Sequence, residues 1–256
     1  MTELLLFGAG IIVGIMNAVA GGGMLIGFPV LLATGMPALI ANATTSIIVL
    51  PGNISSAYAY RKYLRKVPGR YLFLLIPAII GAAIGANIMR HTSSNSFKEL
   101  VPGLILIAVV LFAFQPFLHN QLQQHLHGPK VLRNRIKPLV IVGAAVLPLS
   151  IYGGYFGAGF GFIMLAFLGF THLYEHIHRM NALKNIITIC LSSTSIVVLY
   201  SSHLIDWRHG LVMATGNLIG GYSGARFSQR FSTHAIRIVV IAIGMSAAAY
   251  LALRSY

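Results

Sequence analysis

The sequence predicts an all-α membrane protein in which about eight transmembrane spans form two repeated four-helix units, each with a glycine-broken first helix. Three observations lead to this fold. The composition is strongly apolar, apolar stretches of spanning length recur along the chain, and the two halves match at one fixed offset. Together they favour a multi-pass membrane protein over a soluble domain.

The composition leaves too few charges for a water-facing surface. Of the 256 residues, 57% are hydrophobic and 9% are charged, whereas soluble domains carry about 25% charged residues. A bilayer core about 30 Å thick requires about 20 consecutive apolar residues per spanning helix. We therefore expect an integral membrane protein, surrounded by lipid.

Eight apolar stretches fall into two groups of four. A polar segment, 119–137, separates the groups and predicts a first repeat at 1–118, a basic linker at 119–137 and a second repeat at 138–256. The chain start lacks a basic n-region, and the first stretch is too long for a signal sequence, so we interpret it as a membrane element. The stretches lie at about 4–33, 38–60, 71–89, 100–117, 138–170, 182–202, 209–225 and 236–253.

The charge is strongly basic, with 18 Lys and Arg residues against 4 acids and a net charge of +14. The cations sit in short segments between apolar stretches, as in membrane loops, which argues against nucleic-acid binding. A basic protein suits an anionic substrate. Cys190 is the one cysteine, so neither an intramolecular disulfide nor a paired-cysteine metal site is expected.

The loop cations give a first prediction of orientation. Five lie within 61–70 and four in the linker. If each half crosses the membrane four times, both segments and both termini face the cytoplasm. The same topology places Arg226, Arg230 and Arg237 on the outer side of the membrane, although basic residues are usually more frequent on the cytoplasmic side.

The two halves match when the sequence is shifted by 139 positions. The segment that begins at Gly81 falls on the segment that begins at Gly220 without a gap. Matches at one offset indicate duplication of a four-span unit. The matched pairs are Gly14 and Gly153, Gly22 and Gly161, Asn42 and Asn181, Ser56 and Ser195, Gly81 and Gly220, and Gly85 and Gly224.

The first stretch of each half exceeds one crossing and is interrupted by glycine, at Gly21 to Gly23 and at Gly157 to Gly161. Glycine weakens a helix by about 1 kcal/mol relative to alanine, so we expect two broken helices. Broken backbone at membrane depth is tolerated where it is buried or lines a cavity, which is typical of transporters. The alternative is close helix packing through small residues, which we prefer for Gly216, Gly220 and Gly224.

Polar residues line one face of the predicted span 182–202 and of its match in the first half. On a helix, the six positions of the second half fall within about 60° of one direction. Such a face turns toward the bundle interior or a water-filled path. Hydrogen bonding between helices is the alternative, but packing needs no cation such as Lys184. The positions are Asn181, Lys184, Asn185, Thr188, Ser192 and Ser195, and their matches are Asn42, Thr45, Ser46, Val49, Asn53 and Ser56.

These features fit a site for a small anion. Anion binding needs a cation, amide and hydroxyl donors, and exposed helix N-termini, without a buried acid. The four acids, Glu3, Glu99, Glu175 and Asp206, fall near predicted helix ends or loops. No catalytic residue, metal or cofactor is expected. The candidate substrate-binding residues are Asn42, Thr45, Ser46, Asn53, Asn181, Lys184, Asn185, Thr188, Gly21, Gly22, Gly23, Gly157, Gly159 and Gly161.

One motif suggests an enzyme instead. His172, Glu175 and His176 have the H-x-x-E-H form of an inverted zinc-protease signature. A zinc protease also needs a further ligand and both histidines on one helix face. Here the motif lies in a predicted loop, so a polar loop is the simpler interpretation and an intramembrane metalloprotease is the weaker one.

Several motifs in order resemble the TauE/SafE sulfite exporter family. They begin at Asn17, Pro37, Tyr152, Asn181 and Gly220, reading NAVAGGG, PALIANAT, YGGYFGAGFG, NALK and GGYSGAR, and the likeness covers about residues 8 to 250. The resemblance implies a bacterial-type cytoplasmic membrane permease of duplicated four-helix units that handles sulfite, sulfonates and related anions. Both glycine breaks, Asn42, Asn181 and Lys184 match the recurrent motifs of the family. Phe160 within the second break and the histidine-rich loop 172–178 depart from them, and members differ in cargo and direction.

We therefore expect a permease that carries a small anion, most readily sulfite or an organosulfonate, by alternating access. A channel-like anion pathway is the alternative within transport, and the metalloprotease is the alternative outside it.

Overall fold

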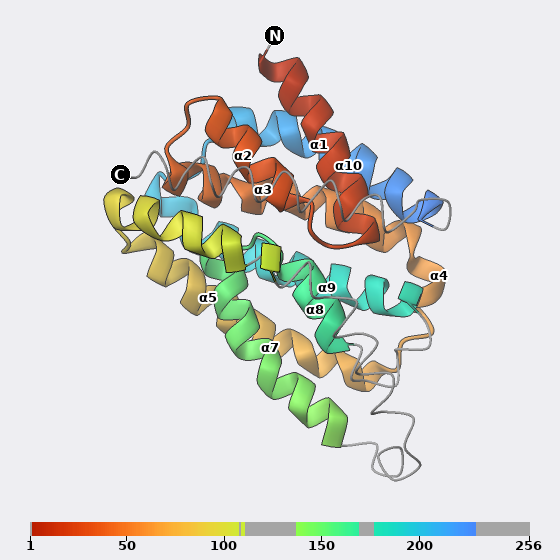
Figure 1. Cartoon of the computed structure of the whole chain (residues 1–256). Coiled ribbons are helices and arrows are strands. Elements are labelled where there is room, and N and C mark those ends of the chain that lie inside the picture. The colour runs from red at the N-terminus through yellow and green to blue at the C-terminus, as the bar shows by residue number, and fades with distance from the viewer. Residues whose placement is uncertain (1, 108, 111–136, 169–176, 229–256) are drawn as a thin grey trace.

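Helices make up the described part of the chain, which in this computed structural model comprises residues 2–107, 109–110, 137–168 and 177–228 (Figure 1). No strand occurs within those ranges. The first half contains α1 (Thr2–Val19), α2 (Met24–Ala33), α3 (Ala38–Ala59), α4 (Arg61–Leu64), η1 (Gly69–Leu74), α5 (Leu75–Arg90) and a helical segment over 94–107 and 109–110. The second half contains α7 (Lys137–Tyr155), α8 (Phe160–Leu168), α9 (Ile177–Leu199), η2 (Tyr200–Ser202) and α10 (Trp207–Phe227).

Four helices in the described ranges are long and apolar enough to cross a membrane: Thr2–Val19, Ala38–Ala59, Gly69–Arg90 and Ile177–Ser202. Met24–Ala33 and Val142–Tyr155 are shorter apolar helices. The predicted stretch 236–253, the linker 119–136 and part of 100–117 lie outside the described residues.

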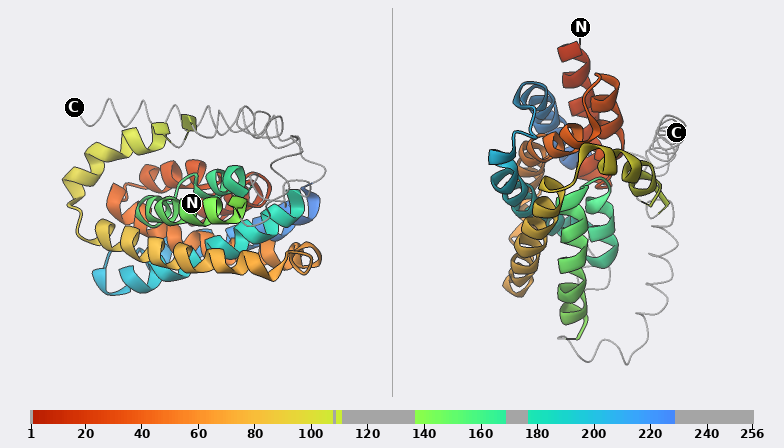
Figure 2. Two further views of the ribbon diagram at one scale, coloured as in Figure 1. Left: turned by 90° about the horizontal axis from the view of Figure 1, so that it is seen from below. Right: turned by 90° about the vertical axis from the view of Figure 1, so that its left-hand side faces the viewer.

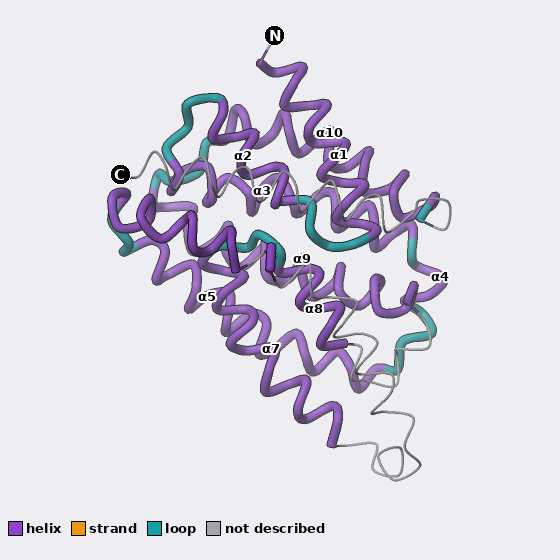
Figure 3. The backbone as a smooth tube through the Cα atoms, in the orientation of Figure 1, coloured by secondary structure: helices purple, strands orange, loops and turns teal. Residues whose placement is uncertain are grey.

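Both glycine-rich breaks turn the chain back on itself. Gly21, Gly157 and Gly159 have φ values of +85°, +72° and +80°, which residues with a Cβ atom rarely adopt. After the first break, the backbone of Gly23 packs against the Val13 carbonyl, so α2 returns along α1. Figure 3 shows the loops of both breaks in the middle of the bundle, between α1 and α2 and between α7 and α8.

The helix directions follow from contacts along their lengths. Gly10 and Gly14 of α1 face Met213 and Asn217 of α10, so these two helices run parallel. Helix α3 is parallel to α10 as well, since Thr44 binds Asp206, Ser56 binds Gly221 and Tyr58 stacks on Tyr222. Helices α5 and α7 are parallel to each other, with Gly81 and Gly85 facing Leu147 and Ile151.

These directions correct the predicted orientation. The Glu3 carboxylate pairs with Arg208 at the start of α10, whereas Arg61 lies at the end of α3, beside the end of α10. The N-terminus and the 61–70 loop therefore lie at opposite ends of the bundle, and Arg226 lies at the same end as Arg61. The prediction failed because it counted the first stretch as one crossing, whereas the break at Gly21 to Gly23 returns α2 to the starting end. We call the two ends the Glu3 end and the Arg61 end.

Packing crosses between the halves. Helix α1 packs on α10 and α7 packs on α5, while α3 contacts both α9 and α10. Figure 2 shows the α1–α2 hairpin (red) beside the α7–α8 hairpin (green), with α3, α5, α9 and α10 along one side of both. Gly216 and Gly220 admit the Phe7 and Ile11 carbonyls, and Gly224 meets the Ile15 backbone. The packing interpretation of these three glycines is confirmed.

Candidate functional site

The two helix breaks meet inside the bundle. A Cβ atom on Gly21 would lie 2.5 Å from the carbonyl carbon of Gly161, and one on Gly161 would lie 2.6 Å from the Gly21 oxygen. Only glycine permits this backbone approach, because any side chain would push the breaks apart. The glycines that the sequence marked as breaks are thus also the point of contact between the hairpins.

A small cavity, partly open to solvent, lies next to this contact. Nine of the fourteen candidate residues line it: Gly21, Thr45, Ser46, Asn53, Gly157, Gly159, Gly161, Lys184 and Thr188. Asn17, Ser192 and Gly153 add polar atoms or backbone, and Met24, Val49, Phe160 and Leu191 add apolar walls. The cavity thus joins both breaks to the polar faces of α3 and α9.

Lys184 provides the amine of this cavity and is only 1% exposed. Its Nζ atom donates to the backbone oxygen of Asn17 at 2.6 Å and to Oδ1 of Asn181 at 3.3 Å. Asn17 lies in the last turn of α1, where unpaired carbonyls give the helix end a partial negative charge. The amine of α9 therefore holds the broken helix of the other half.

Asn42 makes a related contact from α3. Its Nδ2 atom donates to the backbone oxygen of Tyr155, the last residue of α7, at 2.7 Å, and contacts the Met89 sulfur at 3.2 Å. The polar helix of each half thus binds the end of the broken helix in the other half. Asn42 itself does not line the cavity.

The other donors differ in how free they are. The hydroxyl groups of Thr45 and Thr188 donate to carbonyls of their own helices, Asn42 at 2.7 Å and Lys184 at 2.9 Å. Asn17 accepts from the Gly23 amide at 2.8 Å, but its Nδ2 group finds no acceptor in the described part of the chain. An unpaired amide donor in a buried cavity is available to a ligand.

Five candidates lie outside the cavity wall: Asn42, Asn181, Asn185, Gly22 and Gly23. Asn181 accepts a hydrogen bond from Lys184, and Asn185 is fully buried with both amide atoms unpaired among the described residues. Asn17 was missed as a site residue. The signal that could have found it is its place as the one amide residue in an otherwise apolar stretch, one turn before the glycine break.

No carboxylate lines the cavity within the described ranges. Asp206 instead caps α10 by accepting from the His209 amide at 3.1 Å. Burial raises the pKa of the Asp206 carboxyl group, but hydrogen bonds from the side chain and backbone of His209 outweigh it and lower the pKa below its ordinary value. His172, Glu175 and His176 lie outside the described residues, and no group of three metal-ligating side chains occurs among those described.

Comparison with known proteins identifies the family. The sequence profile described as Sulfite exporter TauE/SafE matches residues 6–251. The chain belongs to the TauE/SafE family. The resemblance found in the sequence motifs is thereby confirmed.

Curated relatives agree with this TauE/SafE assignment. A "Probable membrane transporter protein" of Haemophilus influenzae is 33% identical over 93% of this chain and 89% of that protein. The "Probable membrane transporter protein YfcA" of Escherichia coli is 26% identical over 94% of this chain and 87% of its own length. No solved structure was found to match the chain. The protein is a membrane transporter of the TauE/SafE type, as the sequence predicted.

Proposed function

We propose that this protein is a permease for a small anion, with sulfite or an organosulfonate as its substrate, and that the anion binds in the cavity between the two breaks. The observation that carries the proposal is Lys184, a buried amine that opens on a cavity with no acid in the wall described above. Charge-assisted hydrogen bonds from such a group are the strongest that a protein offers to an anion. Neutral donors come from Asn17, Asn53, Ser46 and Ser192.

The contacts of Lys184 and Asn42 with the broken helices of the opposite halves suggest how binding drives transport. An anion that binds Lys184 competes with the Asn17 carbonyl, which holds α1 against α9. Releasing that carbonyl frees the end of α1 to move relative to α9, because few other contacts join these two helices. Alternating access then follows from movement of the broken helices around the anion.

A duplicated architecture supports this movement. The α1–α10 and α3–α10 pairings correspond, at the 139-residue offset, to the α7–α5 and α9–α5 pairings. Helices α1 and α3 begin at the Glu3 end, whereas α7 and α9 begin at the Arg61 end. We infer inverted repeats, an arrangement that lets two halves exchange roles on opposite sides of a membrane.

Transport into proteoliposomes tests the proposal. We expect saturable uptake of sulfite or methanesulfonate, with acetate and chloride competing weakly. Flux that rises linearly with substrate concentration would instead support a channel. No binding or flux for any member of the panel by a folded protein would overturn the anion assignment.

A further inference from the structure

Two arginines at the Arg61 end are held by tyrosine side chains. The Arg61 guanidinium lies 4.4 Å from the centre of the Tyr58 ring and donates to the Tyr58 carbonyl at 3.0 Å. Tyr58 stacks on Tyr222 with ring centres 6.4 Å apart, and Arg226 donates to the Tyr222 hydroxyl at 3.2 Å. Tyr58 belongs to α3, and Arg61 begins α4 directly after it. Tyr222 and Arg226 belong to α10. We call these four residues the Arg–Tyr cluster.

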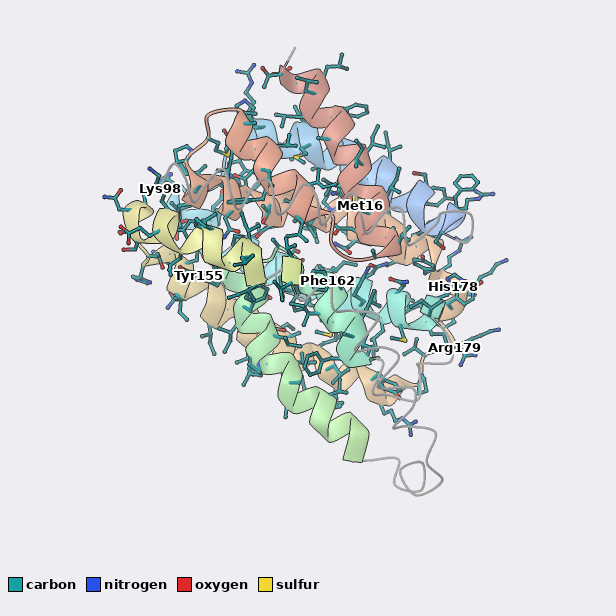
Figure 4. The ribbon with its side chains drawn as sticks, viewed as in Figure 1. Met16, Lys98, Tyr155, Phe162, His178 and Arg179 are labelled. Atoms are coloured by element: carbon teal, nitrogen blue, oxygen red, sulfur yellow. The ribbon has the colours of Figure 1, made fainter. Side chains whose placement is uncertain are left out.

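Charges are distributed unequally between the two ends of the bundle. The Arg61 end holds the five cations of 61–70 together with Arg179 and Arg226. The three acids within the described ranges, Glu3, Glu99 and Asp206, all lie toward the Glu3 end, with Arg90, Lys98 and Arg208. Figure 4 shows Lys98 on one side of the bundle and His178 and Arg179 on the opposite side.

Within the described ranges, the arginines of the Arg–Tyr cluster have no acidic partner. The ion pairs between described residues are Glu3 with Arg208 and Asp206 with His209. Both arginines are exposed, so they are open to a ligand from outside. The Tyr58 ring orients the Arg61 guanidinium, and the Tyr222 hydroxyl group orients that of Arg226, without neutralising either charge.

Apolar side chains continue from the cluster along the outer faces of α3 and α10. Ile54 stands one turn before Tyr58 and is 50% exposed, and Leu218 and Ile219 precede Tyr222 and are 46% and 49% exposed. None of these residues lines the transport cavity. The surface thus has aromatic and cationic side chains at the Arg61 end, followed by exposed apolar side chains along α3 and α10. This is the pattern of a membrane interface.

We propose that the Arg–Tyr cluster is a binding site for an anionic phospholipid, with the lipid phosphate between Arg61 and Arg226 and the acyl chains along Ile54, Leu218 and Ile219. Guanidinium groups bind phosphate oxygens in pairs of parallel hydrogen bonds, which suits two arginines oriented by tyrosine side chains. A zwitterionic lipid gains less, because its choline or ethanolamine cation opposes the local charge. The excess of cations assigns this end to the cytoplasmic leaflet, with the N-terminus on the other side. The inference does not rest on the transported anion.

Counting lipids bound to the purified full chain in detergent by native mass spectrometry tests the site. Phosphatidylglycerol and phosphatidylcholine serve as probes. We expect phosphatidylglycerol to bind at least fivefold more tightly, and Arg61→Gln with Arg226→Gln to weaken it about tenfold, since each cation near a membrane surface contributes several-fold to anionic lipid binding. The matched control is Arg90→Gln with Lys98→Gln, which removes two cations from the Glu3 end and should change binding less than twofold.

A second pair of variants separates geometry from charge. Arg61→Lys with Arg226→Lys keeps the charge but loses the planar fork, so binding should fall between that of the parent and that of the glutamine variant. Inorganic phosphate at millimolar concentration should not displace the lipid, because it cannot use the apolar path. Equal losses in the two glutamine pairs, no preference for phosphatidylglycerol, or displacement by free phosphate would each overturn the site.

Discussion

Helices α3 and α9 carry polar residues at matching positions, but α9 has Lys184 where α3 has Thr45. Both residues line the cavity. Lys184 reaches across to the Asn17 carbonyl, whereas Thr45 bonds back to Asn42 in its own helix. The cavity between these two helices therefore has a lysine on one side only.

The breaks show a second difference. Gly21 combines a positive φ with close backbone contact, while Gly161 makes the same contact without an unusual φ, and Gly157 and Gly159 supply the positive φ in the second half. In the second half, the positive φ and the close backbone contact thus belong to different residues, whereas in the first half both belong to Gly21. Predictions that separate the halves follow in order of expected effect.

The largest effect is expected for Gly21→Ala. A Cβ atom there adds left-handed strain of about 1–2 kcal/mol to an overpacking cost of about 1–3 kcal/mol against Gly161. Transport in proteoliposomes should fall more than tenfold, with a lower thermal unfolding temperature. Gly35→Ala is the matched control, because Gly35 has φ +87° but nothing within 4 Å of an added Cβ atom.

Gly161→Ala completes this comparison, since it tests contact without strain. We expect an effect between those of Gly35→Ala and Gly21→Ala. If Gly35→Ala is as damaging as Gly21→Ala, the contact between the breaks has no functional part.

Lys184→Gln should weaken anion binding by more than tenfold, because a charge-assisted hydrogen bond contributes about 1.5–3 kcal/mol. Thr45→Val, at the matching position, should lose only several-fold through one neutral hydroxyl group. Arginine is not expected to rescue Lys184, since its planar fork needs a different geometry. Titration calorimetry of the purified variants with sulfite measures all three.

Lys98→Gln is the control for this substitution, because Lys98 is exposed and remote from the cavity. The alternative view is that Lys184 extends to the membrane interface as an anchor, which its 1% exposure argues against. Unchanged affinity in Lys184→Gln together with lower expression would nevertheless favour the anchor.

The sequence indicated the parts of the site better than their arrangement. Glycine marks a weak point in a helix, and polar periodicity marks an inward face, so both breaks and both polar helices could be read locally. The direction of the chain after a break depends on contacts distant in sequence, such as Gly21 with Gly161. No local pattern could therefore show that α2 returns along α1.

The same reasoning explains individual residues. Asn17 was missed because one amide in an apolar helix forms no periodic pattern. Asn42 and Asn181 were identified because they lie on the polar faces of their helices. In the structure, however, they bond to Tyr155 and Lys184 and do not line the cavity. Periodicity identifies the face of a helix, but it does not tell which residue on that face reaches the open space.

Asn42→Ala and Asn181→Ala should separate stability from binding. Loss of Asn42 leaves the Tyr155 carbonyl without its bond from α3, a cost of about 1–3 kcal/mol that should lower the thermal unfolding temperature. Loss of Asn181 removes a weaker bond to Lys184 and should change anion affinity by several-fold with little loss of stability. The reverse pattern would show that Asn42, not Asn181, belongs to the anion site.

The smallest effect is expected for His172→Ala with His176→Ala. These histidines belong to the second half alone, since the matching positions of the first half are Ala33 and Pro37. If transport depends on the residues that line the cavity in both halves, histidines present in one half alone should matter little, and uptake should stay within twofold, or about 0.4 kcal/mol. His91→Ala, an exposed histidine at the end of α5, controls for the loss of an imidazole. Two results together would instead support metal chemistry at the H-x-x-E-H motif. The parent protein would bind zinc in an equal molar ratio that the double variant loses, and the double variant would be folded but inactive.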